Sequence, residues 1–133
     1  MLKKIVCVAL PEMAPFEFGV ICEVFGIDRT EQGGPRFDFH VSAAQPGPIR
    51  TPLGFDIIVN EDLSAAADAD LIAIPAYAVG TELHPEVLRV VRDAVDRGAW
   101  VLSVCSGAFA LGAAGILNGR RSTTHWMFAD ALA

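Results

Sequence analysis

Residues 101–115 read VLSVCSGAFALGAAG, and this stretch carries the strongest structural signal in the chain. An apolar strand runs directly into Cys105, and a helix rich in glycine and alanine is predicted over 106–114, ending at Gly115. This order predicts an elbow in which a nucleophile sits in a strained turn between strand and helix. The N-terminus of the following helix favours a thiolate at Cys105. The alternative is a third core cysteine beside a closely packed helix.

Outward from this stretch, short apolar runs alternate with helical periods along the whole chain. That alternation is typical of a layered α/β fold with a mostly parallel sheet. The pattern predicts strands at 4–10, 37–42, 70–75 and 99–104, helices at 16–28 and 85–97, a loop at 31–35, and a hairpin within 47–61.

Composition limits the class of protein. The 133 residues are 53% apolar and 20% charged, which suits one folded domain and excludes disorder. No apolar run reaches the about 18 residues of a membrane span, and the opening apolar run is too short for a signal peptide. We therefore expect a cytoplasmic protein that does not contact a membrane.

Charge and cysteine usage exclude two kinds of site. The formal charge is −6 and no cluster of Lys or Arg exceeds a pair, so this chain by itself is not expected to contact nucleic acid. The spacing of the three cysteines fits neither a disulfide framework nor a zinc site, and we expect no metal and no cofactor. Cys7 and Cys22 lie in apolar segments and are predicted to be buried core thiols.

A longer motif, CSGAFALGAAGILNGRRSTTHW at 105–126, connects the chain to a known family, together with the opening strand, Glu17 and the IPAY turn at 74–77. These residues resemble the ThiJ/PfpI superfamily of class I glutamine amidotransferase-like domains. The motif most resembles the amino-terminal domain of AraC-type transcriptional regulators, and isonitrile hydratases look similar there. The resemblance implies a three-layer flavodoxin-like sandwich. It also implies that relatives need a further strand and helix after His125, so residues 1–133 are expected to be a C-terminally truncated domain.

The resemblance also suggests catalytic candidates. Cys105 matches the elbow cysteine, and Glu17 matches an acidic residue that lies against its sulfur and shares a hydrogen bond with it. The alternative for Glu17 is an ordinary carboxylate at a helix start. His125 matches a histidine near the pocket of some relatives, with a structural role as its alternative. His40 and His84 match nothing and are predicted to be surface or strand histidines.

The chain departs from its relatives around the expected pocket. Ser106 stands where protease-like members have histidine and isonitrile hydratase-like members tend to have threonine; the latter also tend to have aspartate at Glu17. Ala76 and Tyr77 follow Pro75 where many relatives have two glycines. We expect a ligand to be bound by Ala76, Tyr77, Ser106 and Gly107; for Tyr77 the alternative is an exposed loop aromatic.

Three functions remain open at this stage. The first is an effector-sensing and dimerisation domain of an AraC-type regulator, which binds a small molecule, forms a homodimer and reaches DNA through a C-terminal domain outside this chain. The second is a cysteine-dependent enzyme, such as an isonitrile hydratase-like hydratase or a hydrolase of small electrophiles. The third is a dimerisation unit with an inert cysteine.

Overall fold

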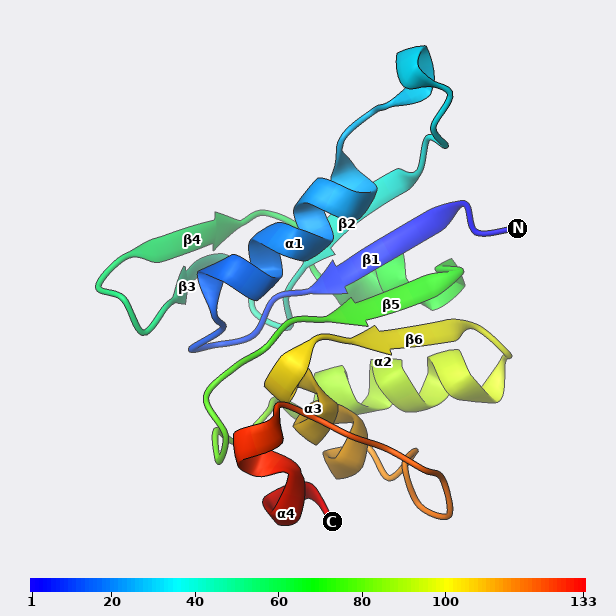
Figure 1. The fold of residues 1–133 in the computed structure, drawn as a ribbon. Helices are drawn as coiled ribbons and strands as arrows, with labels where there is room; N and C mark the ends of the chain where they lie inside the picture. The colour runs from blue at the N-terminus through cyan, green and yellow to red at the C-terminus, as the bar shows by residue number, and fades with distance from the viewer.

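Four parallel strands form the central sheet of the computed structural model, which describes every residue from Met1 to Ala133. The strands are β1 (Lys4–Val8), β2 (Asp38–Ser42), β5 (Leu71–Ile74) and β6 (Trp100–Ser103), in the order β2-β1-β5-β6 (Figure 1). Every neighbouring pair in this sheet is parallel. The carboxyl ends of all four strands therefore lie at one edge, where ligands bind in open α/β sheets.

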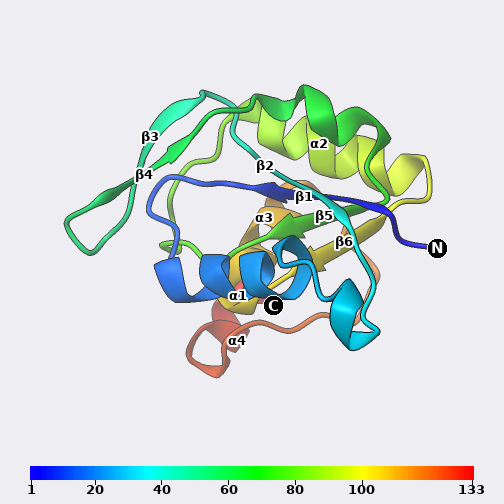
Figure 2. The ribbon, with the colours of Figure 1, turned by 90° about the horizontal axis from the view of Figure 1, so that it is seen from above.

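Helices cover both faces of the sheet. Figure 2 shows α1 (Pro15–Gly26) on one side and α2 (Pro85–Asp96) on the other. The short helix α3 (Ala108–Ala113) contributes to the apolar cluster on the α2 side. This arrangement confirms the predicted three-layer flavodoxin-like α/β sandwich with a mostly parallel sheet.

The two long helices bury their side chains differently. In α2, Val87, Val90, Val91 and Ala94 are buried and the opposite face is charged, so the helix is amphipathic. Only Ile21 is buried in α1, although most of its residues are apolar. A helix that is apolar on all sides is usually covered on all sides, and the outer face of α1 is open here.

The remaining elements lie outside the main sheet. β3 (Gly47–Arg50) and β4 (Asp56–Val59) form the antiparallel hairpin predicted within 47–61. Four 3-10 turns, η1 (Thr30–Gln32), η2 (Leu63–Asp68), η3 (Cys105–Gly107) and η4 (Trp126–Phe128), and the short helix α4 (Ala129–Leu132) complete the chain. The helix predicted over 106–114 thus begins with the 3-10 turn η3, and the loop predicted at 31–35 begins inside η1. None of the helices combines the length and apolar character needed to cross a bilayer.

Candidate functional site

The elbow at Cys105 has the strained backbone that its sequence predicts. Pairing with β5 continues up to Val104, whose N–H donates to the Ile74 carbonyl at 3.0 Å. At the next residue, Cys105, the chain turns with φ of 53°. Side chains rarely adopt this left-handed conformation, which costs about 1–2 kcal/mol. Such strain persists only where the surroundings enforce it.

Two contacts enforce the turn. A Cβ at Gly107 would lie 2.7 Å from the Ile74 carbonyl oxygen and 2.8 Å from that of Pro75, so the chain needs glycine to approach the sheet this closely. From the other side, the Thr124 hydroxyl donates to the Cys105 carbonyl at 2.9 Å. Cys105 itself is partly exposed. The elbow therefore presents a thiol to the edge of the sheet.

Ser106 fastens the elbow to the turn after β5. Its buried hydroxyl donates to the Tyr77 carbonyl at 2.9 Å and accepts from the Tyr77 N–H at 3.1 Å. Ala76 is buried beside it, and its carbonyl accepts from the Ala14 N–H at 2.8 Å. The hydroxyl of Ser106 thus holds the backbone in place, which leaves only its main chain for a ligand.

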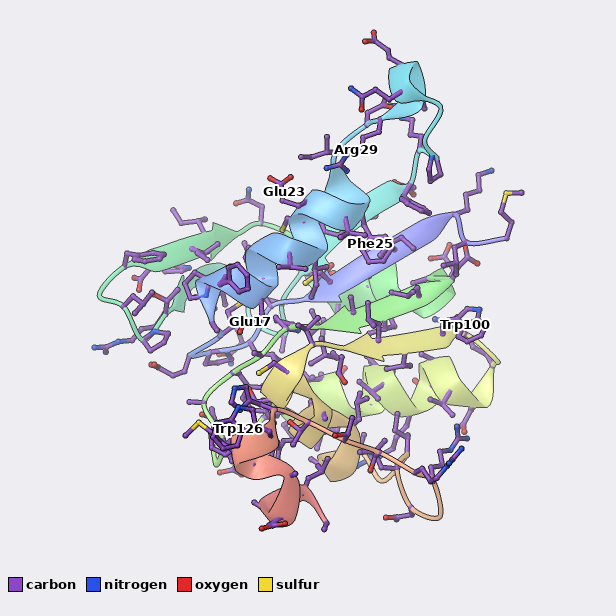
Figure 3. The ribbon with its side chains drawn as sticks, viewed as in Figure 1. Glu17, Glu23, Phe25, Arg29, Trp100 and Trp126 are labelled. Carbon is purple, nitrogen blue, oxygen red and sulfur yellow. The ribbon has the colours of Figure 1, made fainter.

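The Ala14–Ala76 bond brings the start of α1 to the same edge. A backbone bridge between Met13 and Tyr77 reinforces it. Glu17, in the first turn of α1, is partly exposed at this end of the molecule (Figure 3). The hydrogen bonds of the structure include none between the Glu17 carboxylate and the Cys105 sulfur. The geometry thus gathers Glu17 and the elbow at one edge without joining them.

The sequence did not point to Glu12, which lies in the loop between β1 and α1. Its φ is 59°, and Glu12 and Cys105 are the two residues other than glycine with positive φ. Its N–H donates to the Arg50 carbonyl at 2.8 Å, and its carbonyl accepts from the Ala78 N–H at 3.2 Å. Glutamate is not typical of left-handed positions, so no local signal pointed to it.

His125 serves as the cap of η4. Its Nδ1 accepts from the Met127 N–H at 3.2 Å, and its ring stacks on Trp126 with the ring centres 5.7 Å apart. The preceding residue, Thr124, donates to the Cys105 carbonyl, while the contacts of the His125 ring are within the η4 segment. Its Nε2 remains the nitrogen available to a ligand.

Tyr77 is 6% exposed and joins the apolar cluster on the α2 side. Burial raises the pKa of its phenol above the ordinary value. An exposed loop aromatic is therefore wrong for Tyr77. Its backbone belongs to the elbow, while its ring lines a depression beside α2 and α3.

The three cysteines differ in environment. Cys7 is fully buried, as predicted, and desolvation raises the pKa of its thiol strongly. Cys22 is only partly buried, because α1 leaves one side open, and burial also raises the pKa of its thiol. Cys105 is the cysteine placed at the carboxyl edge of the sheet.

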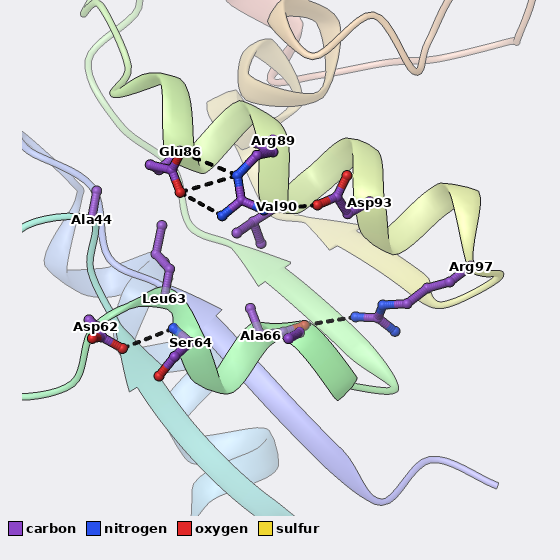
Figure 4. A pocket seen from close by; sticks show the side chains of 11 residues that line it. Ala44, Asp62, Leu63, Ser64, Ala66, Glu86, Arg89, Val90, Asp93 and Arg97 are labelled. Carbon is purple, nitrogen blue, oxygen red and sulfur yellow. Dashed lines mark hydrogen bonds and ion pairs between the residues drawn. The ribbon is translucent and has the colours of Figure 1, made fainter.

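A groove of about 430 Å³ lies elsewhere, between η2 and α2, and none of the predicted site residues lines it. Its charged side chains already have partners: Arg89 binds Glu86 and Asp93, and Arg97 donates to the Ala66 carbonyl (Figure 4) and also to the Ala69 carbonyl. The Arg97 bonds fasten the end of α2 to η2 and the residue after it, whereas the Arg89 bonds lie within α2, so we assign the groove a structural role.

Comparison with known proteins identifies the family of the chain. Residues 3–133 match the model of the DJ-1/PfpI family. The chain belongs to the DJ-1/PfpI family. This DJ-1/PfpI chain is 32% identical over 132 residues to an uncharacterized protein from the cpoL 5′ region of Streptomyces lividans, covering 98% of this chain and 92% of that protein.

Two further sequence relatives are an enzyme and a transcriptional regulator. Isonitrile hydratase of Pseudomonas putida is 34% identical over 87 residues, which cover 64% of this chain and 38% of that enzyme. The HTH-type transcriptional regulator CdhR of Pseudomonas aeruginosa is 27% identical over 96 residues, 71% of this chain and 29% of that protein. This DJ-1/PfpI chain therefore matches well under half of the length of either relative.

Among solved structures, an AraC family transcriptional regulator from Pseudomonas putida superposes with a TM-score of 0.81 at 20% identity. The match covers 98% of this chain and 70% of that one. At this identity the similarity establishes the shared fold.

Proposed function

We propose that this chain is the effector-sensing and dimerisation domain of an AraC-type transcriptional regulator. The observation that carries the proposal is how the groups around Cys105 are used. The Ser106 hydroxyl and His125 Nδ1, which could otherwise activate a nucleophile, are engaged in holding backbone. The similarity to CdhR and to the regulator from Pseudomonas putida supports the same choice.

The effector would bind at the carboxyl edge of the sheet. Cys105, Glu17 and the turn at 75–78 surround this edge, and the hydrogen bonds through Ala76 and Tyr77 make it one connected unit. A small polar molecule that contacts the Ser106 and Gly107 backbone would bind one arrangement of this unit better than another. Such differential affinity shifts the population of a dimer between states, and a DNA-binding domain attached to it would respond.

The open face of α1 supports the dimerisation part. Phe16, Val20 and Val24 are spaced by four residues in α1 and are 77%, 37% and 53% exposed, and Ile27, which follows the end of the helix, is 46% exposed. The four-residue spacing places Phe16, Val20 and Val24 on one stripe of the helix, the α1 stripe. A two-fold axis across the stripe lets a second copy cover the same residues with its own.

A second candidate function is isonitrile hydration, favoured by the similarity to the Pseudomonas putida enzyme and by the partly exposed Cys105. The Cys105 sulfur would bond to the isonitrile carbon, which takes up a proton to give a thioimidate. Water would then attack this carbon, Glu17 would pass the proton that it accepts from the water to the nitrogen, and the carbon–sulfur bond would break as the remaining hydroxyl proton passes to the sulfur. The products are a formamide and the free thiol.

One experiment separates the two functions. The chain is screened against small molecules by thermal unfolding and assayed for formamide production from a panel of isonitriles. A sensor is stabilised by an effector without turnover, and Glu17→Gln weakens the stabilisation while Cys22→Ser, a matched change outside the edge, leaves it unchanged. Turnover that disappears in Cys105→Ser would instead establish the enzyme and overturn the sensor proposal.

A further inference from the structure

A second pocket lies at the carboxyl edge, on the side of β1 away from the elbow. It has a volume of about 250 Å³ and lies where the ends of β1 and β2 meet β3 and the start of α2. Leu10, Ala43, Ile49 and Val87 form its apolar floor, and all four are buried. An apolar cavity of about 150 Å³ is enough to hold benzene, so this pocket has room for a ring with a short substituent.

The rim of this pocket carries donors suited to an anion. Arg50 lines it with a side chain that is 82% exposed and whose partner, Glu12 Oε1, lies 3.9 Å away. His84 lines it as well; because its Nδ1 accepts from the Glu86 N–H at 3.1 Å, its proton lies on Nε2. His84 also caps α2, so the positive end of that helix dipole lies at the rim.

We propose that this pocket binds a small monocarboxylic acid with an apolar ring or branched chain. The apolar part fills the floor, and Arg50 and the Nε2–H of His84 bind the carboxylate. This site differs from the one under the proposed function, and the proposal stands whether or not the Cys105 edge binds an effector.

The pocket is also connected to the elbow by backbone hydrogen bonds. The Arg50 carbonyl accepts from the strained Glu12, and the Glu12 carbonyl accepts from Ala78. Ala78 follows Tyr77, which Ser106 holds through two hydrogen bonds. A ligand that draws Arg50 inward moves the partner of Glu12, and we therefore infer that occupancy changes the exposure of Cys105.

The binding test uses sodium benzoate and its neutral analogue benzamide in NMR titrations of the whole chain. We expect saturable benzoate shifts at the amides of Ala43, Ala44 and Ile49, and weaker binding of benzamide. Losing one charge-assisted hydrogen bond weakens binding about tenfold, so Arg50→Gln should weaken benzoate by about that factor. The matched variant Arg89→Gln, in the groove between η2 and α2, should bind benzoate like the wild type.

Ala44→Leu gives a second variant, because Ala44 lies at the edge of the pocket and is only partly buried. Leucine there should fill the pocket and abolish benzoate binding. Equal affinity for benzoate and benzamide, no saturable binding of either, or binding that Cys105→Ser removes would each overturn the proposal.

The coupling has its own readout. Saturating benzoate should change the rate at which iodoacetamide modifies Cys105, followed by mass spectrometry of the peptide, and Arg50→Gln should remove this effect. An alkylation rate that benzoate leaves unchanged while it binds would refute the coupling and leave the pocket established.

Discussion

Two buried serines are used in opposite ways. Ser42 Oγ is buried at the end of β2 without a hydrogen-bond partner, whereas Ser106 Oγ satisfies both the N–H and the carbonyl of Tyr77. A buried polar group without a partner costs free energy. Removing a buried hydroxyl that has two partners instead leaves both of those partners unpaired. The same substitution should therefore have opposite effects at the two positions.

We expect Ser42→Ala to raise the free energy of unfolding by about 1 kcal/mol and Ser106→Ala to lower it by about 1–3 kcal/mol. Urea unfolding of the two variants beside the wild type measures both changes. A loss of stability in Ser42→Ala would contradict the assignment of an unpartnered hydroxyl.

His40 gives the fold a dependence on pH. Its ring contacts Glu61 Oε1 through Nδ1 and Asp38 Oδ1 through Nε2, each at 2.9 Å, and hydrogen bonding to Glu61 is the main reason that the pKa of His40 is raised. A pKa above the unfolded value of about 6.5 means that the stabilisation is complete below that pH. It is lost as the pH rises through the pKa of the folded protein.

Wild type should therefore exceed His40→Gln in stability by more at about pH 5.5 than at about pH 8.5, with both carboxylates still ionised at the lower value. Because the group is partly exposed, the difference should not exceed about 1 kcal/mol. Thermal unfolding of both proteins across this range measures it; a gap that widens towards alkaline pH would show that the pair does not act as described.

At the scale of elements, the close approach of the elbow to the sheet requires glycine at position 107, whereas the packing of α1 does not require glycine at position 19. An added Cβ at Gly107 meets two carbonyl oxygens below 3.0 Å, while one at Gly19 meets nothing within 4 Å. Overpacking costs about 1–3 kcal/mol, and glycine inside a helix costs about 0.5–1 kcal/mol relative to alanine.

Gly107→Ala should therefore destabilise the chain by about 1–3 kcal/mol, and Gly19→Ala should stabilise it by up to about 1 kcal/mol. Chemical unfolding followed by circular dichroism checks both. If Gly107→Ala matched the wild type in stability, the packing of η3 against β5 would have to be looser than it is here.

The elements themselves were largely predictable. Strands such as 70–75 stand out because apolar residues are continuous and proline ends the run, and Pro85 and Gly98 mark the ends of α2. The first turn after Cys105 was predicted as α-helix and is a 3-10 turn, because the strained cysteine sets its geometry rather than local propensity.

At the scale of the molecule, the chain exposes apolar residues on α1, on the β3–β4 hairpin, on β6 and at Trp126 and Met127. The α1 stripe is compared with β6, where Trp100 is 70% exposed and whose only partner strand is β5. The proposed dimer uses the stripe. Replacing Val24 by Glu places a charge in the α1 stripe, while replacing Trp100 by Lys changes the exposed surface of β6.

Size-exclusion chromatography with light scattering should give a mass of twice 14.2 kDa for the wild type and for Trp100→Lys. Val24→Glu should shift the mass to 14.2 kDa, because a charge buried in an apolar interface has no partner there. A monomeric wild type, or a dimer that only Trp100→Lys breaks, would exclude the α1 stripe as the interface.

The sequence by itself determined the layers, the parallel sheet and Cys105 at an elbow, because these depend on apolar periodicity and on small residues that adjoin a strand. The tertiary structure alone decided the roles of Glu12, Ser106 and His84. The hydrogen bonds of Glu12 and Ser106 join residues that are distant in the chain, and His84 caps α2 and lines a pocket in a way that local patterns do not encode. Whether a polar side chain faces a ligand or holds the backbone depends on what packs opposite it, and that is a property of the folded chain.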